Sequence, residues 1–228
     1  MLTDRILFID GEAIVIDKPA GLAVDPPRDG SPSLVDSLDD LRFGFRRLPL
    51  AVHRLDRDTS GCLLLARNPK AHKKFAAAFE AGVVRKTYLA VLDGVPAERE
   101  GRVDLALAKV SSKEAGWRMV LDESGKRAVT DWRVLAEANG RALVRFAPET
   151  GRTHQLRVHA ASGIGVPILG DPVYGQASGF RMLLHAASIG LDREGKEPVA
   201  ATAPLPISFA NAGFGQVDLA QLDSGDAL

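Results

Sequence analysis

The chain has 228 residues, of which 46% are hydrophobic and 25% are charged, and this composition is typical of a globular protein. No apolar run approaches the ~18 residues of a membrane helix, and the N-terminus lacks the features of a signal peptide, so we expect neither. The single cysteine, Cys62, excludes an internal disulfide. We therefore expect a cytoplasmic protein without membrane contact.

The net charge is zero, but the charges are unevenly distributed along the chain. Between Arg42 and Lys86 there are 11 Lys or Arg residues and 3 acidic residues, so this segment carries +8 and the remainder −8. A locally basic face is what phosphate binding requires. The segment therefore predicts a nucleic-acid surface, although a solvated helix face with acidic residues opposite it would give the same count.

Two short strands open the chain, at residues 6–9 and 13–16, around the turn pair Asp10-Gly11. Leucine and valine then recur at helical spacing between Ser33 and Arg42. This pattern predicts a helix over Ser33 to Arg42, with Ser33 as its N-cap.

A second helix is predicted from about Pro69 to Ala81. Asn68 is a good N-cap, Pro69 suits the first helical position, and Gly82 follows the end. Val83 to Leu92 is predicted to be the next strand.

The rest of the chain reads mostly as hairpins, which favours an antiparallel α+β fold. The predicted strands are Gly101 to Val110, Trp117 to Leu121, Ala128 to Ala136 and Ala142 to Ala147. Asn139-Gly140 is a strong hairpin signal between the last two strands, and Trp132 is expected to pack within that hairpin.

One dense polar motif, His53 to Gly61, lies between two apolar runs. Within it, Arg54 and Arg57 flank Asp56. Guanidinium groups favour the charged form of a neighbouring carboxylate, so Asp56 suits a nucleophile or an electrostatic stabiliser. A loop salt bridge without catalysis is the alternative that these residues leave open.

A second dense motif spans Gly151 to His159. Thr153 is expected to cap a helix that carries Arg157 in its first turns. We predict no metal site, because the spacing of His154 and His159 does not align them on one helix face.

The first motif resembles the H-R-L-D-x-x-T-S-G signature of the RluA-type family of RNA pseudouridine synthases. Further segments resemble motifs of the same family in the same order. They are Lys18 to Gly21 (K-P-A-G), Lys86 to Tyr88 (K-x-Y), Gly151 to His159 (G-R-T-H-Q-L-R-V-H), Pro167 to Gly175 (P-I-x-G-D-x-x-Y-G), Leu184 to Ala186 (L-H-A) and Ala203 to Pro206 (A-P-L-P).

The resemblance implies an α+β fold with a mixed, largely antiparallel central sheet flanked by helices. It implies one catalytic domain over residues 1–228, whose acidic tail, 216–228, we expect to fray. Because few residues precede Lys18, we expect a compact member without the family's S4 RNA-binding module.

By the same resemblance, Asp56 is the catalytic carboxylate, Arg157 pairs with it, and Tyr88 stacks on the target uracil. The implied substrate-binding residues are Arg54, which fills the space left by the extruded base, with His53, Thr59, Lys86, Arg152 and Leu184.

The predicted function is isomerisation of specific uridines in structured RNA, either a ribosomal or a transfer RNA stem-loop. We expect no cofactor and no metal, because the reaction involves neither redox change nor phosphoryl transfer. A monomer is favoured. The alternative is a non-catalytic RNA-binding or RNA-chaperone protein on the same fold.

Overall fold

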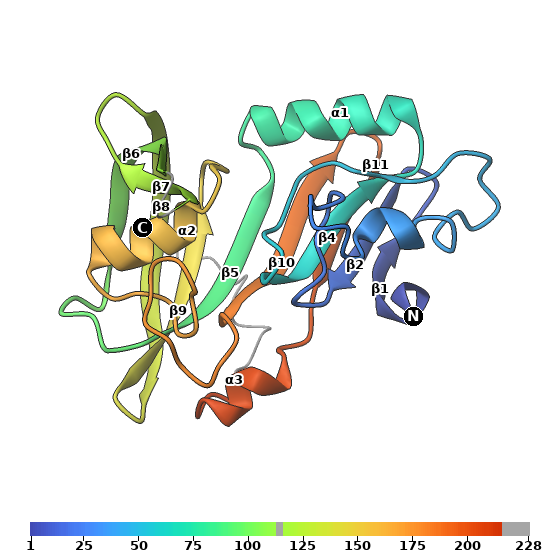
Figure 1. The fold of residues 1–228 in the computed structure, drawn as a ribbon. Coiled ribbons are helices and arrows are strands. Elements are labelled where there is room, and N and C mark those ends of the chain that lie inside the picture. The colour runs from blue at the N-terminus through green and yellow to red at the C-terminus, as the bar shows by residue number, and fades with distance from the viewer. Residues whose placement is uncertain (113–115, 216–228) are drawn as a thin grey trace. The chain divides into compact units, whose positions relative to one another are not determined.

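The computed structural model describes residues 1–112 and 116–215, and the chain divides into two compact units (Figure 1). Unit 1 comprises Met1–Lys86 with His185–Pro204, and unit 2 comprises Thr87–Leu184 with the chain from Leu205 onward. In the described parts of the chain, no helix is both long and apolar enough to cross a membrane. The predicted fraying of the tail, 216–228, lies outside the described residues, and the prediction of a single catalytic domain stays a prediction.

Unit 1 is built on strands that pair mostly in antiparallel fashion. Its strands are β1 (Ile6–Ile9), β2 (Ala13–Lys18), β3 (Leu50–Ala51), β4 (Ser60–Ala66), β10 (Leu184–Arg193), whose first residue belongs to unit 2, and β11 (Lys196–Thr202). β2 and β4 pair over six positions, β1 flanks β2, β3 pairs with β4, and β11 pairs with β10. β4 and β10 are parallel.

β4 is the buried centre of unit 1, as its apolar run predicts. Every residue of β4 is buried. Helix α1 (Pro69–Glu80) packs on it and places Phe75 in one buried apolar cluster with Cys62 and Leu64. The helix begins as predicted, because the Asn68 side chain accepts a hydrogen bond from the Ala71 amide at 2.9 Å.

The predicted helix from Ser33 to Arg42 is wrong in extent. Only a 3₁₀ turn, η2 (Leu34–Ser37), forms there, with Ser33 as its N-cap. Beyond it, i→i+3 hydrogen bonds continue the chain as turns, including the 3.2 Å bond from the Leu41 amide to the Leu38 carbonyl. Leucines three residues apart are buried equally well by such turns, so the apolar spacing does not distinguish them from an α-helix.

Unit 2 contains an antiparallel set of strands in the order β5-β9-β8-β6-β7. Its strands are β5 (Arg85–Leu92), whose first two residues belong to unit 1, β6 (Glu100–Ser112), β7 (Gly116–Leu121), β8 (Lys126–Ala138) and β9 (Arg141–Pro148). The helical segments are α2 (Gln155–Val158), the π-helical η3 (His159–Ile164) and α3 (Ile207–Asn211).

The predicted hairpin of β8 and β9 is confirmed. Asn139 and Gly140 have φ values of +53° and +71°, as its two-residue turn requires. Trp132 pairs with Phe146 across the hairpin, and both are buried in the core of unit 2. With a parallel pairing in unit 1 and antiparallel pairings elsewhere within the units, the predicted mixed, largely antiparallel α+β architecture is also confirmed.

Candidate active site

Asp56 opens a tight turn just before β4. The Thr59 amide donates a hydrogen bond to the Asp56 carbonyl at 3.1 Å, which closes the turn over Arg57 and Asp58. Thr59 is 2% exposed, so its end of the turn is fixed in the protein interior. The turn therefore places the Asp56 carboxylate just before the first residue of the buried strand β4.

Lys18 connects this turn to the preceding loop. Its side chain is fully buried, and its ammonium donates hydrogen bonds to the carbonyls of Pro19, Leu22 and Arg57 at 3.0, 2.8 and 3.1 Å. Burial lowers the pKa of Lys18 to about 8, against the attraction of Asp58, Asp56 and Asp17 in that order. The sequence analysis places Lys18 in a family motif but does not predict these bonds, because the Arg57 carbonyl lies 39 residues further along the chain.

The backbone strengthens the same junction. The Gly21 amide donates to the Arg57 carbonyl at 2.8 Å, and the Arg57 Nε donates to the Gly21 carbonyl at 3.2 Å. The loop at Lys18 and the turn at Asp56 therefore form one hydrogen-bonded assembly.

His53 fastens the other side of the Asp56 loop. Its Nε2 accepts a hydrogen bond from the Leu64 amide at 3.1 Å, and its ring stacks on Phe79 of α1 at 4.5 Å between centroids. Burial and the charge of Lys86 lower the pKa of His53 to about 3, so the ring is neutral at pH 7. These contacts give His53 a structural role, and its predicted contact with substrate stays a prediction.

The end of the motif is held by β10. Ser60 Oγ and His185 Nδ1 lie 2.8 Å apart in the interior. At Gly61, φ is +102° and a Cβ atom would lie 2.2 Å from the Ala186 carbonyl oxygen. Only glycine allows β4 to approach β10 so closely.

The two arginines that flank Asp56 in sequence have acidic partners in the loop before it. Arg54 is exposed and pairs with Asp25 at 2.9 Å, and Arg57 pairs with Asp29 at 3.5 Å. Exposed pairs of this kind contribute about 0–1 kcal/mol each. Lys18 is a buried cation of unit 1 that interacts with Asp56.

In unit 2, the second motif and the Pro167–Gly175 loop meet in a buried ion pair. Arg157 Nε and Nη2 donate to the two carboxylate oxygens of Asp171 at 2.7 and 2.8 Å. Burial acts to raise the pKa of Asp171, but the Arg157 bonds and charge outweigh it and lower that pKa. The same carboxylate accepts from the Val173 and Tyr174 amides. Asp171 therefore fixes the plane of the Arg157 guanidinium.

The prediction that Thr153 caps this helix is wrong. The N-cap is His154, in a left-handed conformation with φ +53°. His154 is held there by the Tyr174 hydroxyl at 2.9 Å from its Nδ1 and by Trp117, whose ring centroid lies 4.9 Å away. These contacts come from distant segments and leave no local signal in the sequence.

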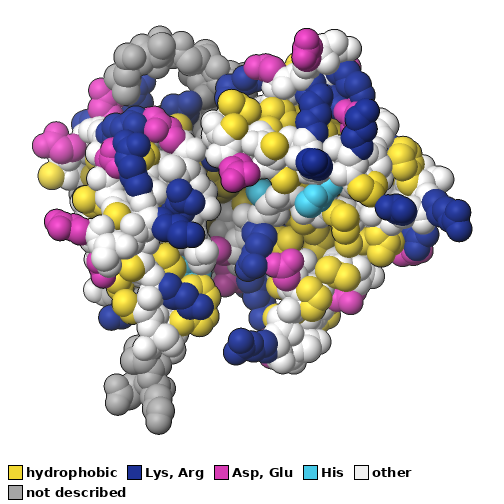
Figure 2. Space-filling view, turned by 90° about the horizontal axis from the view of Figure 1, so that it is seen from above, with side chains coloured by type: hydrophobic (Ala, Val, Ile, Leu, Met, Phe, Trp, Pro, Cys, Tyr) yellow, Lys and Arg dark blue, Asp and Glu magenta, His cyan; other side chains and the backbone are white. Residues whose placement is uncertain are grey.

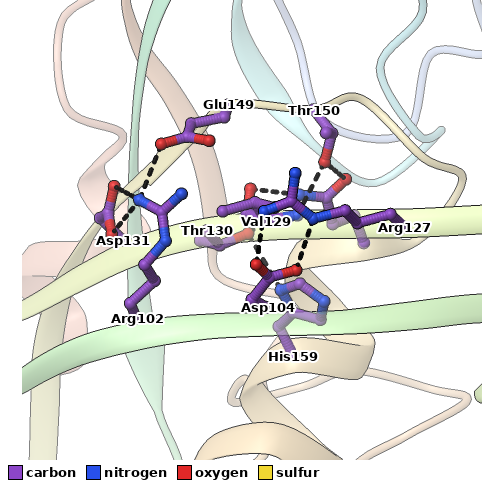
Figure 3. Close-up of polar contacts among 10 residues, drawn as sticks. Arg102, Asp104, Arg127, Val129, Thr130, Asp131, Glu149, Thr150 and His159 are labelled. Carbon is purple, nitrogen blue, oxygen red and sulfur yellow. Dashed lines mark hydrogen bonds and ion pairs between the residues drawn. The ribbon is translucent and has the colours of Figure 1, made fainter.

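Other polar side chains of the motif anchor it to β8 (Figure 3). The Gln155 amide donates to the Val129 carbonyl and the Thr130 hydroxyl, both at 2.9 Å, and His159 Nδ1 lies 3.0 Å from the Thr130 hydroxyl. Burial lowers the pKa of His159 to about 4. Arg152 stays exposed and donates to the Arg127 carbonyl at 3.1 Å.

The remaining predicted residues lie near the start of β5 and of β10. Lys86 is half-buried, and burial lowers its pKa. Tyr88 is half-buried on β5, where it pairs with Phe146 and packs on the core of unit 2. Leu184 belongs to that core and is 4% exposed. Within residues 1–112 and 116–215, no group of three or more potential metal ligands is found.

The basic segment between Arg42 and Lys86 is less exposed to a ligand than its charge suggests. Arg67 is buried, and Arg42 and Arg85 pair with Asp39 and Asp192. On the face in Figure 2, exposed Lys and Arg side chains are accordingly interspersed with acidic and apolar ones.

The sequence and the fold are similar to those of proteins described as pseudouridine synthases. The RNA pseudouridylate synthase family model matches residues 12–162. An uncharacterized RNA pseudouridine synthase of Zymomonas mobilis is 58% identical over 217 residues, which cover 94% of this chain and 99% of that protein. Ribosomal large subunit pseudouridine synthase D of the same organism is 39% identical over 204 residues, and the match covers 82% of this chain and 64% of that relative.

The fold agrees with these matches. The structure of human RNA pseudouridylate synthase domain containing 4 superimposes with a TM-score of 0.78 at 28% identity, over 92% of each chain. Human RNA pseudouridylate synthase domain containing 1 gives 0.74 at 31% identity, over 90% of this chain and 85% of that one. The chain therefore belongs to the RluA-type family, and it is an RNA pseudouridine synthase, an isomerase that acts on RNA.

Proposed function

We propose that the chain isomerises specific uridines in a ribosomal or transfer RNA stem-loop and that Asp56 is the reacting carboxylate. The observation that carries the proposal is the position of Asp56, at the start of a turn that the buried Lys18 ammonium ties to a neighbouring loop. Catalytic groups work best when rigid elements hold them in this way.

The reaction begins with extrusion of the target uridine from its stack, which costs a few kcal/mol and least in a loop. Tyr88 stacks on the uracil and Arg54 occupies the vacated space. Asp56 starts cleavage of the C1′–N1 bond, either by attack on C1′ or by removal of a sugar proton. The base turns and C1′ joins C5. On the first route the Asp56–C1′ bond breaks in this step, and on the second route the sugar proton returns from Asp56. The C5 proton then leaves and N1 gains a proton, so that the product is an isomer.

Arg157 is the proposed partner that keeps Asp56 ionised and oriented. Its fixed guanidinium plane supports this role, because Asp171 holds it through two hydrogen bonds and the Tyr174 ring lies 5.1 Å away. A preorganised cation stabilises a carboxylate without first having to be ordered.

The other proposed substrate contacts differ in character. Lys86 and Arg152 suit phosphate groups, since both are cationic and Arg152 is exposed. Thr59, His53 and Leu184 are fixed in the protein interior or at its edge, so their proposed contribution is to shape the site. The chain is proposed to act as a monomer in the cytoplasm.

The direct test compares Asp56→Asn with Asp58→Asn. Both residues lie in one turn and both attract Lys18, so the two variants perturb the local charge alike. We expect Asp56→Asn to abolish pseudouridine formation with RNA binding retained, and Asp58→Asn to keep most of the turnover. Turnover by Asp56→Asn would refute the assignment.

The RNA can be found by mapping pseudouridine in total RNA from cells with and without the gene. Large-subunit ribosomal RNA is the first candidate, because relatives are named for that subunit, and transfer RNA is the second. Sites that return with wild-type protein but not with Asp56→Asn support the proposal. Purified protein that binds these RNAs but modifies none would favour a non-catalytic RNA-binding role.

A further inference from the structure

Three non-glycine residues have positive φ among the described residues: Phe43, Asn139 and His154. Asn139 precedes Gly140 in a hairpin turn that favours this pair. His154 is held by Tyr174 and Trp117. Phe43 has neither explanation.

Phe43 occupies a turn that suits other residues better. The Phe45 amide donates to the Arg42 carbonyl at 3.0 Å, and φ is +44° at Phe43 and +83° at Gly44, as in a type I′ turn. Phenylalanine is strained there, whereas asparagine is preferred. Its side chain is 46% exposed, and no ring contact is found for it in the described segments. The backbone of Phe43 is therefore strained although its ring is not buried.

The turn is nonetheless fixed. Arg67 is 7% exposed, and its guanidinium donates to the carbonyls of Arg42 and Phe43 at 3.1 and 3.2 Å. The Arg67 guanidinium donates a third bond to the Asp10 carbonyl, just after the end of β1. The guanidinium carbon lies 3.9 Å from the Phe45 ring centroid. Phe43 is thus presented from a rigid support.

Two exposed arginines follow Phe43 in the sequence, and two exposed aspartates, Asp39 and Asp40, precede it. Arg46 and Arg47 are exposed, and no ion pair is found for either within residues 1–112 and 116–215. Arg42 pairs with Asp39. An exposed aromatic ring beside unpaired guanidinium groups suits the stacked bases and phosphates of unpaired RNA.

We propose that Phe43 stacks on an unpaired base of the RNA substrate while Arg46 and Arg47 bind its phosphates. This inference rests on the proposed function, which supplies the ligand, a stem-loop RNA. It adds a contact surface in unit 1 outside the two dense motifs.

Phe43→Asn separates binding from folding, because it places the preferred residue in the turn. We expect the melting temperature to rise by about 2–4 °C. Affinity for a labelled stem-loop RNA with a uridine-rich loop should fall about tenfold, the loss of roughly one base stack. Val95→Asn, at another exposed apolar loop position, is the control and should leave affinity unchanged. Unchanged affinity of Phe43→Asn, or an equal loss in the control, would overturn the inference.

The arginines are tested by salt dependence. Arg46→Gln with Arg47→Gln should reduce the slope of log affinity against log salt by about 1.4–1.8. Arg99→Gln with Arg133→Gln removes two arginines that pair with Glu137 and Glu100, and it should change the slope less. Equal slopes in the two double variants would contradict phosphate binding by this turn.

These outcomes are distinct from a failure of the proposed function. A wild-type chain that binds RNA without isomerising it would refute the proposed activity, while loss of binding in Phe43→Asn would still support the stacking contact. A wild-type chain that isomerises RNA, with Phe43→Asn unchanged in affinity, would refute the stacking contact alone.

Discussion

Replacing Lys18 with methionine tests whether the buried ammonium holds the Asp56 turn. Methionine fills much of the same space but donates no hydrogen bond. The substitution leaves the carbonyls of Pro19, Leu22 and Arg57 without the donor that they share. We therefore expect the loop at Lys18 and the turn at Asp56 to separate.

The size of the effect follows from two opposing contributions. Hydrogen bonds from a charged donor contribute about 1.5–3 kcal/mol each, so three give roughly 4–9 kcal/mol. Against this, burial that lowers the pKa of Lys18 from 10.5 to about 8 costs about 3 kcal/mol at neutral pH. The net expectation is a loss of about 3 kcal/mol in the free energy of unfolding, or about 6–12 °C in melting temperature.

The pH dependence has a definite sign. The folded-state pKa of Lys18, about 8, lies below its ordinary value of 10.5, so the unfolded chain binds more protons between these values. Wild-type stability should therefore rise relative to Lys18→Met as pH increases above 8, by about 2 kcal/mol up to about pH 9.5. Below pH 8 the difference should be constant.

The assay is urea unfolding of both proteins from pH 7 to 9.5, with Lys86→Met as the control. Burial also lowers the pKa of Lys86, but no hydrogen bond or ion pair of its side chain is found among the described residues. We expect Lys86→Met to be as stable as the wild type or slightly more so. If Lys18→Met melts within about 2 °C of the wild type, the ammonium does not hold the two loops together.

Two further substitutions test the supports of the site. Asp171→Asn removes the carboxylate that pairs with the buried Arg157 guanidinium and should lower the free energy of unfolding in urea by about 3–5 kcal/mol. Asp192→Asn breaks an exposed pair and should lower it by less than about 1 kcal/mol. Similar losses in the two variants would contradict the buried-pair assignment. Gly61→Ala brings Cβ to 2.2 Å from a β10 carbonyl oxygen and should cost more than about 4 kcal/mol, whereas Gly30→Ala, with φ +71° in open space, should cost about 1–2 kcal/mol by the same measurement. Equal costs for the two alanines would mean that φ alone, and not the close strand approach, requires glycine at Gly61.

The elements predicted correctly from the sequence are those whose determinants are local. Asn68 and Pro69 mark the start of α1, and Asn139-Gly140 marks a hairpin turn, because each residue acts on the backbone beside it. The helix predicted over Ser33 to Arg42 fails because leucine spacing reports burial and not the hydrogen-bond pattern.

The candidate active site was less predictable because its contacts join distant segments. Lys18 bonds a carbonyl 39 residues away, and Ser60 meets His185 125 residues away. The pairing of Arg85 in the basic segment was equally hidden, since its acidic partner lies 107 residues further on. The role of a residue that depends on such distant contacts cannot be predicted from the spacing of residues near it in the sequence.

The first dense motif is long because most of its residues hold the backbone that carries one carboxylate. His53 binds β4 and α1, Arg57 binds the loop at Lys18, and Gly61 admits β10. Each of these contacts constrains the chain within five residues of Asp56, from a different neighbouring element. In the proposed reaction Asp56 meets the sugar of an extruded nucleotide, which requires its position to be fixed to a fraction of an ångström, and a two- or three-residue turn alone does not supply that precision. Substitutions at these supporting positions should therefore lower turnover by displacing Asp56, even where they touch no RNA.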